Sequence, residues 1–394
     1  MKKDEIALEK TGGVFPYLSP LLSVITTAVL YSIVMGLLVP LIIFRLNAQG
    51  PSEIFIGLNS ALFAVGTLLA APCMPFAFKR IAMSRLLLLS TIADTILIVG
   101  LMYFDSLLAW NVIRFLLGVS NGSLVVVISS WVMNLTQAGN RARILGSLRS
   151  LSAVGFFVGA TALVWIGIEG LRAFCFVIGL IVVAAITMLL TRPCYISSEC
   201  NKKPPQGLRK CFHRASIPIV TNGFLAFLGA GSTTLLPVYA IRQGLNETQA
   251  TGLMSAFMAG GVFWPLAAAW LADRWQATKV WWLSSLNQLA ALLMLWLMQA
   301  DSLWLMVFIW SSFMAGLFTV TQILVSQHFS EMALVEVNAA TNISTGLGLL
   351  LGPLAVGWGM VLGGTTGFIL VLLFANILFF GFVIIQKREA NSLI

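Results

Sequence analysis

Long apolar segments separated by short polar ones account for almost the whole chain. Twelve segments of spanning length follow one another, and each could cross a hydrocarbon layer of about 30 Å as a helix. Lipid does not tolerate unpaired backbone groups, and no β-barrel alternation is visible, so every segment is predicted to be α-helical. The expected spans are residues 17–44, 53–78, 86–104, 107–136, 144–166, 173–190, 215–239, 248–271, 280–298, 302–326, 338–360 and 364–386.

Composition agrees with a protein that resides in a membrane. Of the 394 residues, 59% are hydrophobic and 9% are charged, whereas a soluble globular chain has about 25% charged residues. The first apolar segment is too long for a signal peptide, and no convincing cleavage site follows it, so we expect it to remain as the first span.

The distribution of Lys and Arg predicts the orientation. With the amino terminus placed in the cytoplasm, the outer loops hold Arg45, Arg172 and Arg242, and most of the other basic residues fall in cytoplasmic segments. This bias predicts a multi-pass protein of the cytoplasmic (inner) membrane with both termini inside. We therefore attribute the net charge of +9 to orientation and expect no nucleic acid partner.

The cysteines do not indicate a metal site. Cys194, Cys200 and Cys211 lie in one polar loop with His213, but their spacing matches no CxxC pair. We expect free thiols on the cytosolic side, no metal and no cofactor.

The chain is predicted to consist of two related halves. The polar stretch 191–214, which contains Pro204 and Pro205, is interpreted as a cytoplasmic linker between six-helix bundles at 1–190 and 215–394. Gly57-Leu58-Asn59-Ser60-Ala61 recurs as Gly252-Leu253-Met254-Ser255-Ala256, and Gly155-xxx-Gly159 recurs as Gly348-xxx-Gly352. These matches occur in the same order and six spans apart, which indicates a duplication in parallel orientation.

The segment Leu107 to Thr136 is the most informative, because it is almost wholly apolar yet contains Arg114. Arg in the middle of a bilayer costs roughly 3 kcal/mol on insertion scales, and such residues usually face a bundle interior or a wet cavity. Gly118, Asn121 and Ser129 follow on about the same helix face. A functional role for Arg114 is favoured, and the alternative is a structural arginine paired to backbone carbonyls.

These features together resemble the major facilitator superfamily, and within it the YcaD-like branch of bacterial transporters. Arg114-Phe115-Leu116-Leu117-Gly118 is similar to the fourth-helix motif of the family, whose arginine is tied to proton transfer in many members. Val125-Val126-Val127-Ile128-Ser129-Ser130 resembles a stretch of this branch that has glutamate where Ser129 stands. The resemblance implies an all-α membrane fold of twelve transmembrane helices in two parallel six-helix repeats, which usually works as a monomer.

The resemblance also implies a conformational gate. Leu271-Ala272-Asp273-Arg274 is similar to the family's loop motif, which locks cytoplasmic helix ends. The first copy, Phe78-Lys79-Arg80, departs from the motif because Lys79 stands where the acid is expected. The gate is therefore assigned to Asp273, Arg274 and Arg80, with the first two carrying most of it.

One acidic residue, Asp94, lies deep within a span. Counted along their helices at about 1.5 Å per residue, Asp94 and Arg114 lie at depths that differ by roughly 5 Å. We hypothesise that the two side chains interact and that protonation of Asp94 is coupled to the conformational change. A fixed ion pair, or an Asp94 without a transport role, remains the alternative.

Arg149 is the second base within a span. Together with Arg114 it predicts a substrate that is negatively charged or rich in acceptors, since a planar guanidinium suits carboxylate and phosphate. Alternatively, Arg149 extends to the cytoplasmic headgroups.

Further substrate contacts are expected on spans one, four, seven and ten, which line the path in the family. Any single one of these polar or aromatic side chains is also compatible with helix packing. The candidates are Tyr31, Asn121, Ser129, Asn222, Tyr239, Trp310 and Gln322, with Thr27, Thr233 and Ser311 beside them.

The sequence favours a secondary transporter of a small solute, anionic or amphipathic, that is coupled to protons and embedded in membrane lipid. No GxxxxGK[ST] motif is present, so a gradient must supply the energy. The direction of transport stays open. A membrane enzyme would need a catalytic cluster, and His328 with Glu331 matches no metal motif. A sensor that has lost transport is the third alternative.

Overall fold

The computed structural model describes residues 20–78, 80–104, 106–135, 141–189, 215–297, 302–329 and 331–389. Within these ranges the regular structure is helical. The helices are α1 (Pro20–Ala48), α2 (Glu53–Phe78), α3 (Met83–Tyr103), α4 (Leu107–Leu135), α5 (Arg141–Ile166), α6 (Arg172–Leu189), α8 (Ser216–Arg242), α9 (Glu247–Arg274), α10 (Ala277–Leu297), α11 (Leu303–His328) and α12 (Glu331–Glu389).

Helix α12 consists of two helices that follow each other without a loop. The backbone of Gly364 has φ 58° and ψ −137°, a conformation that glycine adopts without steric cost. The chain reverses there, so that Gly367 packs against the backbone of Gly359. The expected spans 338–360 and 364–386 are therefore the two arms of α12.

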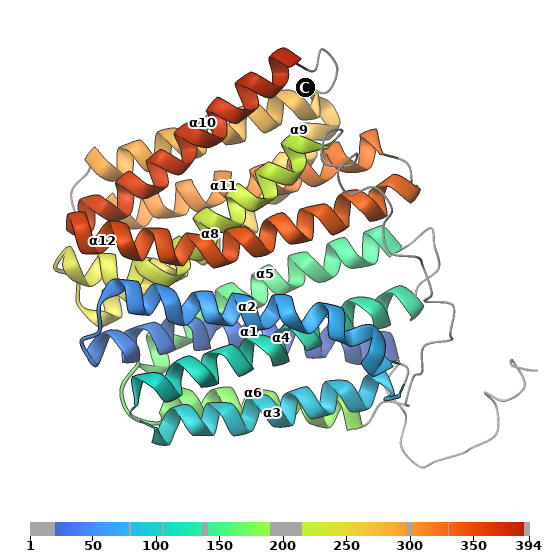
Figure 1. Cartoon of the computed structure of the whole chain (residues 1–394), viewed down its shortest axis with the longest axis vertical. Coiled ribbons are helices and arrows are strands. Elements are labelled where there is room, and N and C mark those ends of the chain that lie inside the picture. Colours follow the sequence, from blue (N-terminus) through green and yellow to red (C-terminus); the bar gives the residue numbers. More distant parts are fainter. Residues whose placement is uncertain are drawn as a thin grey trace, which may run out of the picture.

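The expected twelve spans and the fold class are confirmed. Among the described residues, ten helices are long and apolar enough to cross a membrane, and one of these, Ala340–Gln386, contains both arms of α12. The remaining span is α5, in which Ser150–Ile166 forms a shorter apolar helix within the described side chains. The described start of α1 and end of α12 lie at the same end of the bundle (Figure 1).

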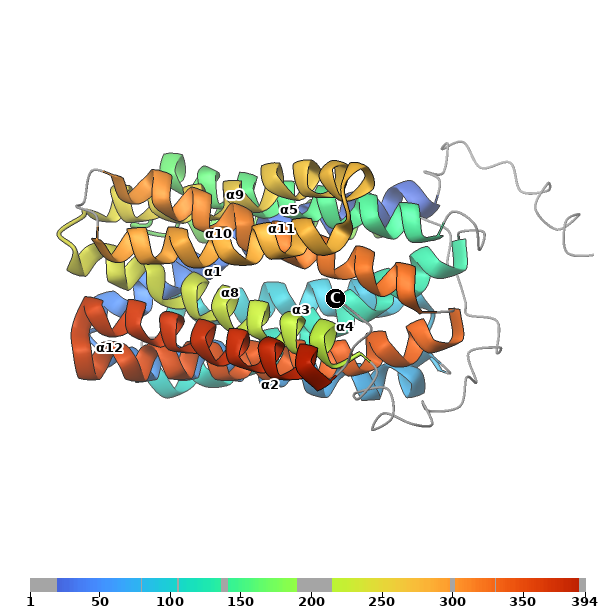
Figure 2. The same ribbon diagram turned by 90° about the horizontal axis from the view of Figure 1, so that it is seen from above.

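The helices form two groups that lie one above the other in Figure 1. We call α1–α6 the first half and α8–α12 the second half. Within the first half α1 packs on α5 and α2 on α4, and within the second half α8 packs on α12 and α9 on α11. The halves meet mainly where α2 contacts α12 and α5 contacts α9, and the helices run roughly parallel from end to end (Figure 2). The boundaries at 190 and 214 stay a prediction, because residues 190–214 lie outside the described ranges.

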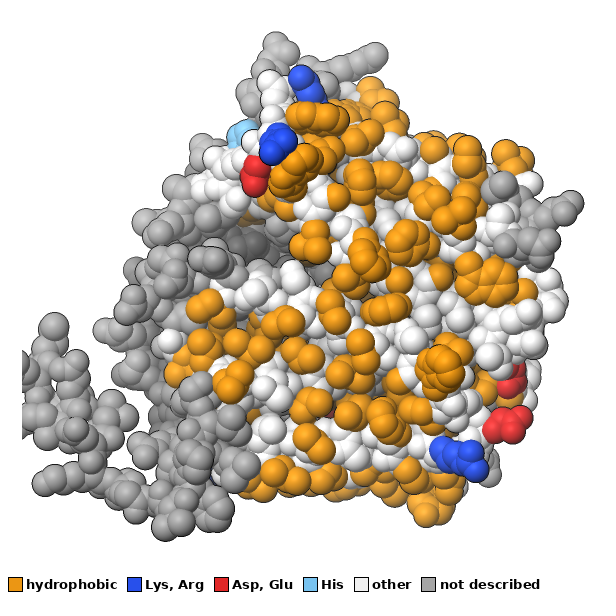
Figure 3. Space-filling view, turned by 180° about the vertical axis from the view of Figure 1, so that it is seen from behind, with side chains coloured by type: hydrophobic (Ala, Val, Ile, Leu, Met, Phe, Trp, Pro, Cys, Tyr) orange, Lys and Arg blue, Asp and Glu red, His pale blue; other side chains and the backbone are white. Residues whose placement is uncertain are grey.

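The outward surface of the helices is strongly apolar. Orange side chains dominate the face in Figure 3, and the few charged groups there lie near its margins. Trp165 and Leu297 are at least 80% exposed, a degree of exposure that lipid tolerates and water disfavours. The helices are accordingly assigned to the membrane as spans.

The repeated glycine pairs have matching roles in the two halves. Gly159 of α5 touches the carbonyl of Ile33 on α1, and Gly352 of α12 touches the carbonyl of Phe227 on α8. In each half the fifth helix therefore lies against the first with backbones in contact, as small residues permit in membranes. The sequence repeat corresponds to a repeat of helix packing.

For reference we call the end of the molecule near Ala48, Glu53, Ile166 and Arg242 the outer end, following the predicted orientation.

Substituting these glycines tests the packing. A methyl group at Gly159 would overlap the carbonyl of Ile33, whereas one at Gly179 of α6 meets no atom within 4 Å. Overpacking costs about 1–3 kcal/mol, so Gly159→Ala should lower the Tm of purified protein by several degrees. Gly179→Ala should leave the Tm unchanged or raise it slightly, because alanine favours the helix. Equal Tm values for the two variants would contradict the packing described.

Candidate functional site

Asp94 lies inside the first half and is bound by a tyrosine from another helix. Its side chain projects from α3 and is 1% exposed. The phenol of Tyr31, on α1, donates a hydrogen bond of 2.8 Å to Asp94 Oδ2. Asp94 Oδ1 has no hydrogen-bond partner within the described part of the protein. A buried carboxylate with a free oxygen can still accept a proton or another donor.

Arg114 lies beside this pair, also buried, at 3% exposure. Its guanidinium carbon lies 4.5 Å from the centre of the Phe63 ring on α2, an arrangement that contributes about 2 kcal/mol when it is desolvated. Nε and Nη1 of Arg114 have no protein partner within the described ranges. Among the described residues, the arginine contacts an aromatic face and no hydrogen bond to a backbone carbonyl is found.

Among the described side chains no direct contact joins Asp94 to Arg114, and their coupling stays a prediction. Among the described side chains, the ion pair found within 4 Å joins Glu53 to Arg242 and does not involve Asp94. The phenol of Tyr31, which donates to Asp94, lies on the side of Arg114. The physical reason is that α1 inserts its tyrosine beside α3 and α4, while Arg114 stacks on α2. We call Tyr31, Asp94 and Arg114 the buried triad.

Neighbouring polar groups of α4 complete the surroundings of the buried triad. Ser120 donates to the carbonyl of Ser90 at 3.1 Å and also faces the Asp94 carboxylate. Asn121 is half-buried and faces the phenol of Tyr31. Ser129, two turns further along, is half-buried. Asn121, which belongs to the predicted polar face of α4, thus lies next to the buried triad.

In the second half, two of the predicted residues meet. Gln322 on α11 donates to Asn222 Oδ1 on α8 at 3.4 Å. Asn222 also donates to the carbonyl of Pro218 at 2.8 Å, within its own helix. Gln322 is half-buried.

The aromatic candidates of the second half have packing partners elsewhere. Tyr239 stacks on Phe368 with ring centroids 4.8 Å apart and accepts a hydrogen bond from Gln243. Trp310 is fully buried and donates to Gln288 Oε1 at 3.3 Å. The structure does not bring either residue to the Asn222–Gln322 pair through a described contact.

Sequence reasoning missed several buried amides. Gln288 donates to Asn376 between α10 and α12, and Asn59 donates to Asn111 between α2 and α4 at 2.9 Å. An amide inside an apolar span is itself a signal, because it must find a partner in lipid. These pairs connect helices within one half, which is a structural use.

The remaining candidates are located only in part. Arg149 belongs to α5, but its side chain lies outside the described ones. Asp273, Arg274 and Arg80 are exposed at helix ends, and Arg274 stacks on Trp270 at 4.2 Å. No ion pair of Asp273 occurs within the described ranges. The gate stays a prediction.

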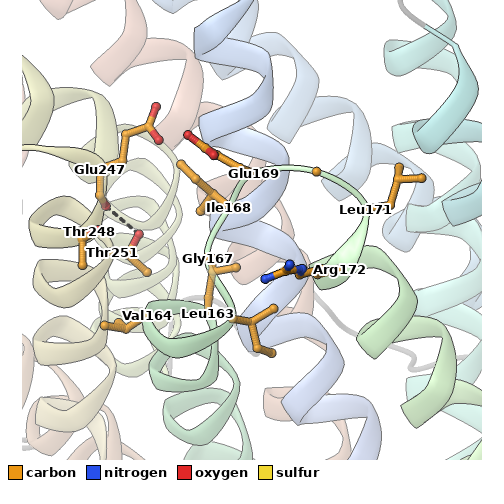
Figure 4. A pocket seen from close by; sticks show the side chains of 12 residues that line it. Leu163, Val164, Gly167, Ile168, Glu169, Leu171, Arg172, Glu247, Thr248 and Thr251 are labelled. Carbon is orange, nitrogen blue, oxygen red and sulfur yellow. Dashed lines mark hydrogen bonds between the residues drawn. The ribbon is translucent and has the colours of Figure 1, made fainter.

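Two cavities are prominent among the described residues. One, of about 520 Å³, lies at the outer end between the α5–α6 loop and the start of α9. Figure 4 shows Glu169 and Glu247 on one side of it and Arg172 on the other. The second, of about 660 Å³, is an apolar groove between α8 and both arms of α12, and Arg114 lines neither cavity.

The chain belongs to the Major Facilitator Superfamily, whose sequence pattern it matches over residues 24–353. The match and the apolar helices together assign the chain to a family of multi-pass membrane transporters. The resemblance noted from the motifs is thereby confirmed.

Individual relatives agree with that assignment at low identity. The uncharacterised MFS-type transporter YfkF of Bacillus subtilis is 21% identical over 252 residues, which are 62% of this chain and 64% of that protein. The uncharacterised MFS-type transporter YcaD of Salmonella paratyphi A is 22% identical over 264 residues, which are 66% of this chain and 68% of that protein. The alignment with YfkF therefore spans less than two thirds of either chain.

Solved structures share the fold. A bacterial homologue of the human lysosomal transporter Spinster, inward-facing and unoccupied, has a TM-score of 0.73 at 17% identity, with 95% of this chain and 96% of that chain covered. The nucleoside transporter NupG has a TM-score of 0.74 at 12% identity, with 94% and 98% covered. The D-xylose-proton symporter has a TM-score of 0.72 at 14% identity, with 92% and 97% covered.

The hydrogen bond between Tyr31 and Asp94 can be tested through stability. Tyr31→Phe removes the donor and leaves a buried carboxylate oxygen without a partner, which costs about 1–3 kcal/mol. The variant should unfold several degrees below the wild type in a thermal melt. Tyr239→Phe is the matched control, because the Tyr239 hydroxyl is contacted by the flexible, exposed Gln243. A Tyr31→Phe melt no lower than that of Tyr239→Phe would contradict the described geometry.

Proposed function

We propose that the protein is a proton-coupled secondary transporter that moves a small anionic solute across the membrane by alternating access. The observation that carries the proposal is the buried triad, in which Asp94 and Arg114 both have polar atoms without a partner among the described residues of an apolar bundle. Buried polar atoms are normally paired. A proton for Asp94 and an acceptor group for Arg114 would supply the missing partners.

The charges of the proton on Asp94 and of the anion at Arg114 make the binding of each depend on the other. With Asp94 ionised, the triad contains one negative and one positive charge and is neutral. With Asp94 protonated, the triad carries a net positive charge that the low-dielectric surroundings do not tolerate well. A monovalent anion bound at Arg114 restores neutrality. Protonation and anion binding therefore favour each other, which is a positive and reciprocal coupling.

The same argument gives the direction of coupling. An anion that enters together with a proton crosses as a neutral unit, so the proposal is symport of one proton with each unit of substrate charge. Asn121, which faces Tyr31, is the nearest predicted substrate contact in the first half. The Asn222–Gln322 pair is proposed as its counterpart in the second half.

Membership of a family of transporters supports transport over catalysis. We therefore propose that the chain has no enzymatic activity and that it acts as a monomer with both termini in the cytoplasm. Rocking of the two halves about their contacts would expose the site alternately to each side. Arg149 is proposed as a second contact for the anion.

A ligand screen tests the substrate class. Thermal shifts of the purified protein are measured with small mono- and dicarboxylates, inorganic phosphate and amphipathic cations at two pH values. We expect stabilisation by an anion that is stronger at the lower pH and lost in Arg114→Ala. Stabilisation by cations alone, or by anions in Arg114→Ala to the wild-type extent, would contradict the proposal.

The pH dependence of binding tests the coupling. Wild-type protein should bind the identified anion more tightly as the pH falls, because protonated Asp94 leaves the triad positive. Asp94→Asn should bind at every pH as tightly as the wild type does at low pH, and should lose uptake driven by a pH gradient in proteoliposomes. Glu169→Gln, which changes an exposed acid, should keep the wild-type pH dependence. An Asp94→Asn variant with wild-type pH dependence would refute the role of Asp94.

A further inference from the structure

An ion pair joins the two halves at the outer end of the molecule. Glu53 lies in the first turn of α2, and Arg242 lies in the last turn of α8. Arg242 Nη2 pairs with Glu53 Oε1, and the Glu53 side chain is 11% exposed. Removal of either partner would leave the other charge without its counterion, and for Glu53 that charge is nearly buried.

The ion pair covers a close contact of backbones. Arg242 Nη1 reaches the carbonyl of Met360 at 3.5 Å, so one guanidinium contacts both α2 and α12. About one turn further along α2, Gly57 touches the carbonyl of Pro353, and Gly357 of α12 touches the carbonyl of Glu53. The Arg242 side chain and these backbone contacts therefore join the two halves at the same interface.

The repeat places a second arginine in the corresponding position of the first half. Arg45 ends α1 as Arg242 ends α8, but Arg45 donates to the carbonyl of Gly170 and lies 5.9 Å from the Phe174 ring centre. Both contacts are within its own half. On that side the halves leave the cavity of about 520 Å³ between the α5–α6 loop and α9.

We propose that Glu53 and Arg242 form a one-sided latch that holds the outer end closed, and that Arg45 has no part in it. The latch itself does not depend on the proposed function, and only its physiological use rests on alternating access. Breaking the latch should release α2 from α8 and α12 and shift the population towards forms that are open at the outer end. The side near the cavity has no such tie among the described residues.

Spin-label distances across the outer end test the latch. The five native cysteines are replaced, and labels are attached through Gln49→Cys and Leu362→Cys, which are exposed positions in the two halves. In lipid nanodiscs, Glu53→Gln and Arg242→Gln should each add a longer distance to the distribution measured by pulsed electron resonance. The charge-reversed double variant, Glu53→Arg with Arg242→Glu, should restore the wild-type distribution.

Arg45→Gln is the matched control, because it removes the same charge from the corresponding helix end. It should leave the distribution unchanged. The latch is refuted if both single variants keep the wild-type distances, or if Arg45→Gln lengthens them as much as Arg242→Gln. Only variants that elute as a single monodisperse species are compared, and Arg242→Lys provides a conservative substitute that should keep the wild-type distances.

A second label pair separates the latch from alternating access. Arg85→Cys and Gln276→Cys mark exposed positions at the opposite end of the two halves. Shortening of this distance in Glu53→Gln would support both the latch and the proposed mechanism. Lengthening at the outer end with no change at the opposite end would leave the latch standing and would contradict the alternating-access mechanism.

Discussion

A charged group inside an apolar helix bundle has to find its partner within the protein, because lipid supplies none. This constraint governs the first half, where Asp94 and Arg114 lie among α1 to α4 at 3% exposure or less. Tyr31 resolves part of the problem by donating to the carboxylate, and Phe63 does so by presenting its ring to the guanidinium. These contacts leave one oxygen of Asp94 and two nitrogens of Arg114 without a described partner. A proton and an anion can supply the missing partners.

The need to pair buried polar groups also explains the architecture around the buried triad. Amide pairs such as Asn59–Asn111 and Gln288–Asn376 connect helices within a half, while glycines allow α5 to contact α1 and α12 to contact α8 through their backbones. The two halves share this plan but differ at their outer ends. Arg242 reaches across to Glu53, whereas Arg45 turns back into its own half. The two corresponding arginines therefore make different contacts at the outer end.

The spans and the repeat were predictable from the sequence because both are local signals. Uninterrupted apolar runs define helices of spanning length, and Gly155, Gly159, Gly348 and Gly352 mark close packing wherever they occur. The partner of Asp94 was not predictable in the same way. Counting residues gives the depth of a side chain in the membrane but not the direction in which its helix face is turned. Tyr31, which is 63 residues away in sequence, is a hydrogen-bond partner of Asp94 that this count could not indicate. Trp310 and Tyr239 likewise met aromatic and amide partners that no spacing revealed.

The central claim is that Asp94 takes up and releases a proton inside the first half, with Tyr31 as its partner. Infrared difference spectroscopy of the protein in membranes, recorded as the pH is lowered, observes this step directly. The account predicts a carboxylic acid C=O band that grows in as the pH falls, shifts in Tyr31→Phe and is absent in Asp94→Asn. A spectrum in which Asp94→Asn retains every carboxylic acid band of the wild type would contradict it.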